Sequence, residues 1–378
     1  MKSSRPYVAS VHDTRKVNFR RLLPLAVVAL GLTAYGQTAA PLVKPSLPNP
    51  YRLDPAWPTL PAGMTGPNGR KWGEVIRVHV APDGNIWVFH RCFNDKPAGD
   101  ASCVNQGDAK PPLLEFNPAG RLLRTIGPGL FAHPHGFTVD RDGNLWTTDT
   151  NDEAAGPKIG QTVLKLSPSG RVLMTIGTPG VAGTGPATFD RPTGVAIAPN
   201  GDIFVSDGHS GNKSGAGRIV KYSPDGTFIR AWGRLGTEPG NFRDPHDLYV
   251  GGTRGYVYVA DRQNNRIQVF DQDGTFITAW RQFGQPSSVF VDTRDNLYVG
   301  STYQDPSTRE SPAGPNHRAI VVGDAITGEL RYLIPDPGDL ARMTDTGTSA
   351  SGIAVDDAGN IYAADVGFNN LRKYVRVQ

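Results

Sequence analysis

The sequence contains little cysteine. Only Cys92 and Cys103 occur among its 378 residues, at the two ends of a polar segment that contains glycine and aspartate. Two cysteines cannot by themselves hold a structural zinc ion, because such sites use about four protein ligands. In an oxidising compartment we expect the pair to form a disulfide that pins this segment, with free thiols or a two-cysteine metal pair as the alternatives.

The amino-terminal part offers no apolar run long enough for a transmembrane helix. Its apolar segment covers residues 22–32 and follows a basic stretch that ends at Arg20 and Arg21, whereas a bilayer span needs about 20 apolar residues. Small residues come next, so residues 1–40 are predicted to be a secretory signal peptide, cleaved after Gly36 or Ala40. We therefore expect a periplasmic or extracellular protein. The alternatives are export by the twin-arginine route and an uncleaved leader that anchors the chain.

A basic face is missing as well. Residues 1–40 contain six Lys/Arg and one acid, so their removal changes the formal charge from +4 to −1, with 33 basic against 34 acidic residues. A protein that binds nucleic acid needs clustered basic residues on its folded domain, and the sequence shows no such cluster. We expect no nucleic-acid partner, and no membrane partner once the leader is removed.

Glycine, proline and an internal repeat are abundant. The 45 glycines and 32 prolines, with 20% charged residues, are typical of a turn-rich β protein. A strand, a D-G or N-G type turn and a second strand recur along the chain. The copies are HGFTVDRDGNLWTTD (135–149), TGVAIAPNGDIFVSD (193–207), HDLYVGGTRGYVYVAD (246–261), SSVFVDTRDNLYVGS (287–301), SGIAVDDAGNIYAAD (351–365) and the diverged IRVHVAPDGNIWVFH (76–90).

The second half of the unit is another hairpin, as in VLKLSPSGRVLMTIG and RIQVFDQDGTFITAW. Each unit is thus a four-stranded blade, and six copies predict an all-β, six-bladed β-propeller over residues 51–378. The last unit has only three strands before the chain stops, so residues 51–58 are predicted to complete blade six and cover its edge. Residues 41–50 are rich in proline and are interpreted as a linker.

The start of each blade's first strand should line the central axis. Aligning the copies places one residue per blade there, a set that we call the axial ring: Ile76, His135, Thr193, His246, Ser287 and Ser351. His135 and His246 belong to blades two and four, so their imidazoles can converge on a metal ion. The alternative is that both histidines only form hydrogen bonds at the axis.

A second ring follows the end of each second strand. Its members are Arg91, Thr150, Gly208, Arg262, Thr302 and Val366. Arg91 and Arg262 lie in opposite blades and could hold a carboxylate, or each could pair with a nearby acid. His209 follows this ring in blade three and could be a general base, a metal ligand or a solvated loop residue. We expect Arg266 to face outward and the recurrent strand-end aspartates (Asp149, Asp207, Asp261, Asp365) to be structural.

These residues resemble the bacterial NHL-repeat propellers related to the peptidyl-α-hydroxyglycine α-amidating lyase. The motifs that carry the resemblance are PHGFTVDRDGNLW, RPTGVAIAPNGDIFVSDG, DPHDLYV and VYVADRQNNRIQVF. The family holds zinc by three axial histidines, which implies His135, His246 and the blade-six position, where this chain has Ser351. Its channel arginines match Arg91 and Arg262, and its catalytic tyrosine falls near His209.

The resemblance implies zinc-assisted cleavage of a carbinolamide, in which an arginine clamps the carboxylate and glyoxylate is released. Zinc is therefore the expected cofactor, with calcium as a second candidate cation, and a small peptide or another carboxylate-bearing molecule is the expected ligand. A non-enzymatic scaffold that binds a peptide, glycan or protein partner stays open, because a fold alone does not define a function. A metal-dependent lactonase or esterase is disfavoured, since the axial ring has no acidic ligand.

Overall fold

The computed structural model describes residues 47–60, 73–91, 111–150, 159–210, 215–302, 318–337, 350–367 and 369–377. All of them belong to one compact unit, Val43–Gln378. The predicted leader, most of the predicted linker and the predicted Cys92–Cys103 disulfide lie outside the described residues. Among the residues described, no helix is both long enough and apolar enough to cross a membrane.

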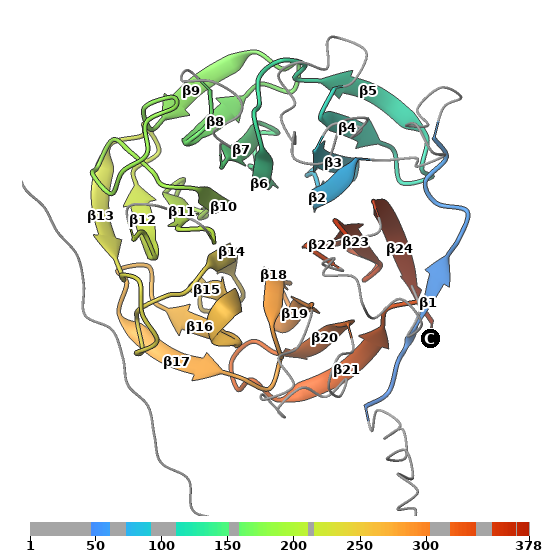
Figure 1. Cartoon of the computed structure of the whole chain (residues 1–378). Coiled ribbons are helices and arrows are strands. Elements are labelled where there is room, and N and C mark those ends of the chain that lie inside the picture. Colours follow the sequence, from blue (N-terminus) through green and yellow to red (C-terminus); the bar gives the residue numbers. More distant parts are fainter. Residues whose placement is uncertain are drawn as a thin grey trace, which may run out of the picture. The chain divides into compact units, whose positions relative to one another are not determined.

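The described chain forms six four-stranded antiparallel sheets arranged around a central axis, as Figure 1 shows. Blade one contains β2 (Glu74–Val80), β3 (Ile86–Arg91), β4 (Leu113–Phe116) and β5 (Leu122–Ile126). Blade two contains β6 (Pro134–Val139), β7 (Leu145–Asp149), β8 (Thr162–Leu166) and β9 (Val172–Ile176). Blade three contains β10 (Pro192–Ile197), β11 (Ile203–Asp207), β12 (Arg218–Tyr222) and β13 (Phe228–Trp232).

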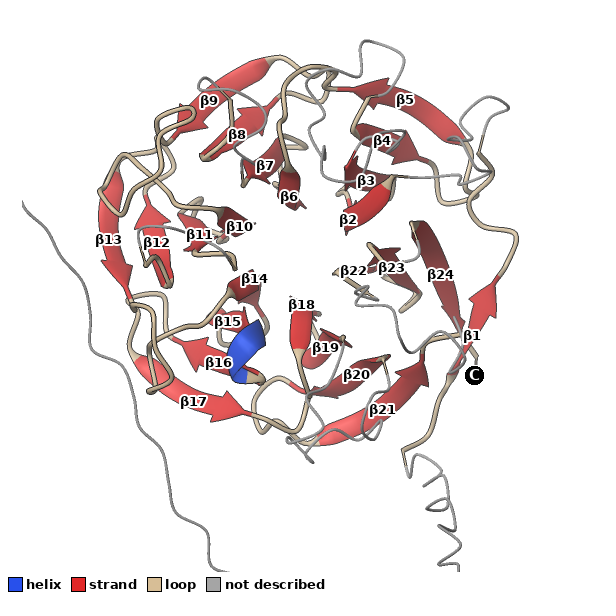
Figure 2. Ribbon diagram, in the orientation of Figure 1, coloured by secondary structure: helices blue, strands red, loops and turns tan. Residues whose placement is uncertain are grey.

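Blade four contains β14 (Pro245–Gly251), β15 (Tyr256–Asp261), the 3-10 helix η3 (Arg262–Asn264), β16 (Arg266–Phe270) and β17 (Phe276–Trp280). Blade five contains β18 (Pro286–Val291), β19 (Asn296–Ser301), β20 (Ala319–Asp324) and β21 (Leu330–Pro335). Blade six contains β22 (Gly352–Val355), β23 (Ile361–Asp365), β24 (Asn370–Arg376) and β1 (Tyr51–Asp54). The prediction of an all-β, six-bladed propeller is confirmed (Figure 2).

Blade six is closed by the strand from the amino-terminal end of the domain. Strand β1 pairs antiparallel with β24, with Tyr51 opposite Arg376 and Asp54 opposite Lys373. The predicted closing segment therefore supplies the missing outer strand, although only its first part, Tyr51–Asp54, is in the strand. Joining the two ends of the domain in one sheet covers the edge of β24, which would otherwise present unpaired backbone groups.

Aspartates at the first turn of several blades explain why these hairpins form. In blade two the carboxylate of Asp140 accepts hydrogen bonds from the backbone N–H of Asn144 at 2.8 Å and from Nε1 of Trp146 at 3.0 Å. The carboxylate fixes the turn and at the same time satisfies the indole of a buried core residue. Local turn chemistry and core packing therefore favour the same register.

The hydrophobic core lies between neighbouring blades, with one cluster of buried side chains at each of the six interfaces. Between blades five and six, Tyr51 packs with residues that include Tyr298, Ile320 and Tyr374. Because each blade buries its faces against two neighbours, the ring is stable only when all blades are present.

Substitution of Tyr51 by alanine is expected to lower the free energy of unfolding by about 3 kcal/mol or more, the usual cost of removing a large buried aromatic side chain. The Tyr51 side chain is 5% exposed and closes the interface between blades five and six. Equilibrium unfolding in urea measures the change. Arg52→Ala is the matched control, because Arg52 is exposed in the same strand and should change stability by no more than about 0.5 kcal/mol. Equal stability of the two variants would contradict a latching role for β1.

Candidate functional site

The axial ring is built by a β-bulge that recurs at the start of the first strand. In blade four the register between β14 and β15 shifts between Pro245 and Asp247, so His246 is the extra residue. The same irregularity encloses Ile76 in blade one, His135 in blade two, Thr193 in blade three and Ser287 in blade five. A bulge re-aims a side chain relative to the regular pleat. The bulge is therefore the local backbone feature that orients the side chains of the axial ring.

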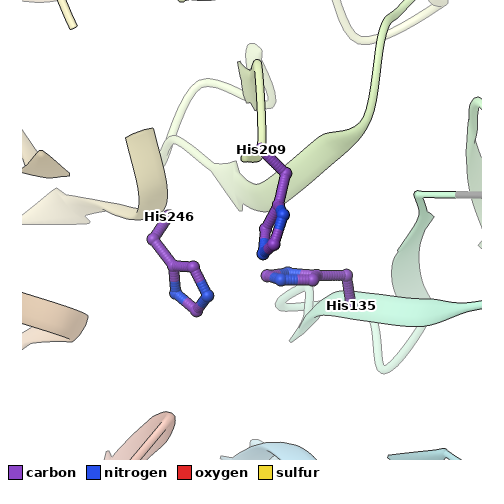
Figure 3. Close-up of side chains that lie close together, drawn as sticks. All are labelled: His135, His209 and His246. Carbon is purple, nitrogen blue, oxygen red and sulfur yellow. The ribbon is translucent and has the colours of Figure 1, made fainter. Parts of the chain in front are cut away.

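Three imidazoles converge beside the axis, and Figure 3 shows their rings pointing toward one another. His135 comes from β6, His246 from β14 and His209 from the loop after β11. One ring nitrogen of each lies within 4.8 Å of the corresponding atoms of the other two. The ring centroids are 4.7 Å apart for His135 and His246, 4.9 Å for His135 and His209, and 5.3 Å for His209 and His246. We call these residues the histidine cluster.

The two axial histidines have defined tautomers. Nδ1 of His135 lies 2.9 Å from the carbonyl oxygen of Thr193, and Nδ1 of His246 lies 2.7 Å from that of Ser287. A carbonyl only accepts, so each Nδ1 donates its hydrogen to the axial residue of the next blade. Burial lowers the pKa of both imidazoles well below the ordinary value, so both are neutral. A neutral imidazole that donates from Nδ1 has its lone pair on Nε2.

His209 is delivered to the cluster by a glycine turn. Gly208 has φ +124°, and a Cβ at this position would lie 2.3 Å from the carbonyl oxygen of Ala216, so only glycine fits. The backbone N–H of His209 donates to the carbonyl oxygen of Arg191 at 3.1 Å. Burial is the main cause that lowers the pKa of His209 to about 4, and the charges of Arg262 and Arg91 act in the same direction.

This donor set fits a zinc ion. Nε2 of His135 is buried and has no hydrogen-bond partner among the described residues. Three neutral imidazoles with ligand atoms this close match the three protein ligands of catalytic zinc sites. The backbone carbonyls bonded to Nδ1 of His135 and His246 are the outer contacts that orient metal-binding histidines. Burying such lone pairs beside one another without a partner would be costly.

Blade six contributes no imidazole, because Ser351 holds its axial position and is fully buried. Its carbonyl oxygen accepts a hydrogen bond from Nη1 of Arg77. The candidate metal site is thus made by blades two, three and four, on one side of the axis. The sequence motifs alone place the third ligand of the resembled family in blade six.

The two arginines of the second ring lie near the cluster. Arg91 lowers the pKa of His135 and His209 through its charge, and Arg262 does the same for His246 and His209. Each arginine also has an acidic partner. Nη1 of Arg91 lies 2.5 Å from Oε2 of Glu74.

Arg262 is held by a single aspartate. Its Nη2 and Nε lie 2.7 Å and 2.8 Å from Oδ2 of Asp244. Of the two interpretations that the sequence left open, pairing with an acid is thus observed for both arginines, and the hold on a carboxylate stays a prediction.

Two expectations about neighbouring residues have different outcomes. The expected outward position of Arg266 is wrong: its side chain is 3% exposed and its Nε donates to Asp261 at 2.7 Å. The register pairs Arg266 directly with Asp261, which explains the burial. The recurrent aspartates make structural contacts, as predicted. For example, Asp207 accepts the backbone N–H of Asp190 and pairs with Arg218.

Sequence reasoning missed four charged or titratable neighbours of the cluster: Arg77, His133, Asp244 and Asp247. The charge of Arg77 lowers the pKa of His135 and His246, and His209 lowers that of His133. Arg77 and Asp247 directly follow axial residues, so the alignment of blades could have indicated them. Asp244 is the first residue of the motif DPHDLYV, two places before the axial His246, so the motif could have indicated it as well.

Comparison with known proteins places the chain in a family. The NHL repeat model matches residues 189–222 and 242–270. NHL repeat-containing protein 3 of Homo sapiens is 30% identical over 346 residues, which cover 86% of this chain and 84% of that protein. The chain belongs to the NHL-repeat family. The predicted NHL-repeat propeller is thereby confirmed.

The chain is also similar to amidating lyases. The probable peptidyl-alpha-hydroxyglycine alpha-amidating lyase pgal-1 of Caenorhabditis elegans is 30% identical over 214 residues, or 54% of this chain and 57% of that protein. Peptidyl-glycine alpha-amidating monooxygenase A of Xenopus laevis is 34% identical over 212 residues. The matched part is 52% of this chain, and it spans about a fifth (21%) of the monooxygenase.

A solved structure shares the fold. A gluconolactonase from Xanthomonas campestris superposes with a TM-score of 0.54 at 16% identity, covering 88% of this chain and 99% of that one. Identity this low supports the propeller architecture and nothing about the reaction.

Proposed function

We propose that this protein is a zinc-dependent carbon–nitrogen lyase that cleaves peptides ending in α-hydroxyglycine and releases glyoxylate. The observation that carries the proposal is the convergence of His135, His209 and His246, whose ring nitrogens lie within 4.8 Å of one another. The similarity to the amidating lyase of Caenorhabditis elegans supports the substrate class. Arg91 and Arg262 beside the cluster supply groups that recognise a carboxylate.

The cluster would hold zinc through three neutral nitrogen ligands. A bound zinc ion would polarise the substrate hydroxyl and lower its pKa, which is the chemistry that zinc supplies in catalytic sites. The hydrogen bonds from Nδ1 of His135 to Thr193 and from Nδ1 of His246 to Ser287 keep Nε2 as the ligand atom. Because these acceptors are backbone carbonyls, the two rings cannot turn without losing buried hydrogen bonds.

His209 is better suited to bind the ion than to act as the general base. With a pKa of about 4, its imidazole is neutral at pH 7 and is a weak proton acceptor for a hydroxyl group. An efficient base has a pKa near the working pH, whereas a ligand only needs to be deprotonated. We therefore assign His209 to the site as the third ligand.

The reaction is balanced without an oxidant or reductant. The substrate hydroxyl loses its proton, the C–N bond breaks, and the amide nitrogen gains a proton. The carbinol carbon becomes the aldehyde carbon of glyoxylate, and the peptide leaves as an amide. The chain's own task is to orient the substrate so that the C–N bond lies next to the acidified hydroxyl.

The arginines can perform that orientation. Arg91 donates hydrogen bonds from Nε to the carbonyl oxygen of Pro134 and from Nη1 to Glu74. Arg262 contacts the carboxylate of Asp244 through Nε and Nη2. Within the described part of the chain, Nη2 of Arg91 and Nη1 of Arg262 thus keep N–H groups for a ligand. Guanidinium groups fixed by acids on one side can present the remaining donors to a carboxylate at little entropic cost.

The charges around the cluster also favour an anion once a dication is bound. Each nearby arginine has one acidic partner: Arg77 with Asp247, Arg91 with Glu74, and Arg262 with Asp244. These pairs cancel, and the imidazoles are neutral. A bound dication would leave an excess of positive charge in a largely buried site, where a carboxylate is the complementary group.

The direct test is release of glyoxylate from a peptide that ends in α-hydroxyglycine, measured with the zinc-loaded protein. Arg262→Ala is expected to lower kcat/KM about 10- to 100-fold, because a hydrogen bond to a charged group contributes about 1.5–3 kcal/mol. Zinc content should stay unchanged. The matched control is the same variant with a substrate whose carboxylate is converted to an amide, on which Arg262→Ala should have little effect.

A zinc-loaded wild-type protein that releases no glyoxylate would exclude the lyase. A second function then applies, that of a propeller that binds a carboxylate-bearing ligand without turnover. It is favoured by the similarity to NHL repeat-containing protein 3, which extends over 86% of this chain, against 54% for the lyase of Caenorhabditis elegans. Binding of an α-hydroxyglycine peptide in the absence of cleavage would support it.

A further inference from the structure

Arg77 spans the axis and contacts the backbone of one member of the histidine cluster. Its Nη1 donates to the carbonyl oxygens of Ile76, at 2.9 Å, and of Ser351. Its Nη2 donates to the carbonyl oxygen of His246 at 2.9 Å and lies 3.4 Å from Oδ1 of Asp247. One guanidinium group therefore joins the inner strands of blades one, four and six.

The surroundings are shaped to hold this side chain. Arg77 is 3% exposed. A Cβ on Gly352 of blade six would lie 2.7 Å from Cα of Arg77 and 3.2 Å from its Cδ, so a larger residue at position 352 would displace it. Two glycines, Gly136 and Gly194, follow the axial residues of blades two and three as Gly352 does in blade six. A Cβ on Gly194 would lie 3.0 Å from Oδ1 of Asp247, so Gly352 leaves room for Arg77 and Gly194 for its carboxylate partner.

Burial of the Arg77 guanidinium is energetically costly and must be compensated. A buried guanidinium loses its hydration, and the loss is offset only when good acceptors surround it. Three backbone carbonyls and the Asp247 carboxylate provide that compensation for the two Nη groups, whereas Nε of Arg77 has no hydrogen-bond partner in the described part of the chain. Oδ2 of Asp247 in turn accepts the backbone N–H of Val289 at 3.1 Å, which links the pair to blade five.

Three of these acceptors belong to residues of the axial ring: Ile76, His246 and Ser351. Among them, His246 is a member of the histidine cluster, and its imidazole is held at Nδ1 by Ser287 and its backbone by Arg77. The imidazole of His246 is therefore fixed by the neighbouring blade five, and its backbone by blade one on the opposite side of the axis. Ser351 occupies the axial place in the blade that provides no imidazole, and its carbonyl anchors the same guanidinium.

We propose that Arg77 is a positioning residue of the zinc site, which fixes the backbone of His246 by tying it to blades one and six. This inference rests on the proposed zinc site and extends it. Blade six then contributes to the site through the carbonyl of Ser351, as an anchor for Arg77, in place of a ligand.

Arg77 could otherwise act only through its charge, and the two roles predict opposite results. A cation close to the site repels a bound dication, so its removal would raise zinc affinity if charge alone mattered. Removal of a group that positions a ligand should lower zinc affinity about 10- to 100-fold, as is usual for outer contacts of metal ligands.

The test compares zinc dissociation constants of the wild type, Arg77→Met and Arg77→Lys at pH 7, together with the visible absorption of the Co²⁺-loaded proteins, which reports ligand geometry. We expect Arg77→Met to bind zinc about 10- to 100-fold more weakly and to change the Co²⁺ spectrum. Arg77→Lys should not restore either property, because one ammonium group cannot serve three carbonyls on different blades. Full restoration by lysine, or unchanged or tighter zinc binding by Arg77→Met, would overturn the proposal.

Two further variants separate positioning from a general loss of stability. Arg77→Met/Asp247→Asn removes the buried pair together and leaves no unpaired charge, and it should still bind zinc at least about tenfold more weakly. Arg372→Met removes another buried arginine, which lies in blade six and pairs with Asp365 of the same blade and with Asp336 at the end of blade five, and it should leave zinc affinity unchanged. A matching loss of zinc affinity in Arg372→Met would contradict a specific role for Arg77.

A wild type that binds no zinc would overturn the zinc site and this inference together. Zinc binding by the wild type together with unchanged zinc affinity in Arg77→Met would overturn this inference alone.

Discussion

Replacement of His246 by alanine is expected to lower the affinity for zinc roughly 100- to 1,000-fold. Structural zinc sites bind with about 10–16 kcal/mol over four ligands, so one ligand contributes about 3–4 kcal/mol. His246 is buried, its ring lies 4.7 Å from that of His135, and its Nδ1 is committed to Ser287. The wild type should contain one zinc ion per chain after loading, and elemental analysis with competition against a chelator measures both quantities.

The same measurement decides the role of His209. If His209 is a zinc ligand, the variant His209→Ala should lose zinc affinity to the same extent as His246→Ala. If His209 is a general base, the variant should keep its zinc and lose only turnover. His79→Ala is the matched control: His79 is another imidazole whose pKa burial lowers to about 4, and it contacts Thr138 outside the cluster. Zinc binding that survives in all three cluster variants would exclude the proposed site.

Acidification is expected to destabilise the metal-free protein strongly between pH 6.5 and pH 4. Burial lowers the pKa of all six histidines in the described residues, to about 4 for His79, His90 and His209 and well below the ordinary value for the others. In the unfolded chain these groups titrate near pH 6.5, so the unfolded state binds more protons throughout this window. Each histidine then costs about 1.4 kcal/mol of stability per pH unit as the pH falls.

Buried carboxyl groups act in the opposite direction. Burial raises the pKa of Asp207 to about 7 and that of Asp247 to about 6, so the folded state binds protons there first and gains stability as the pH falls. Two such groups offset about a third of the histidine effect, and the net loss from pH 7 to pH 5 is about 8 kcal/mol. This loss is comparable with the total stability of many domains.

Urea unfolding of the metal-free protein at pH 7 and pH 5 checks this expectation, because the midpoint should fall sharply at the lower pH. His79→Ala removes one of the six titrating groups and should reduce the difference between the two pH values by about 2 kcal/mol. Equal stability at pH 7 and pH 5 would show that the imidazoles are not held neutral by burial.

The repeat made the architecture predictable from the sequence. Aspartate-anchored turns such as the one at Asp140, strands with apolar residues, and a three-stranded last unit together predict six blades closed by residues 51–58. The same alignment identified His135 and His246, because every blade copies one backbone geometry and equivalent residues must face the axis. These features depend on local chemistry and on periodicity, and both can be recognised in the amino-acid sequence.

Tertiary structure alone decided how the site is completed. His209 joins the cluster because Gly208 turns the loop of blade three inward, and Arg77 reaches blades four and six because Gly352 leaves space for it. Arg266 is buried by its register opposite Asp261. The Arg266 contact lies within one hairpin, whereas the contacts of His209 with the axial histidines and of Arg77 with blades four and six join residues far apart in the sequence. The sequence by itself determined the blades and the two axial histidines, whereas closure of the ring decided the third imidazole and the contacts of Arg77, because only the folded ring sets distances across the axis.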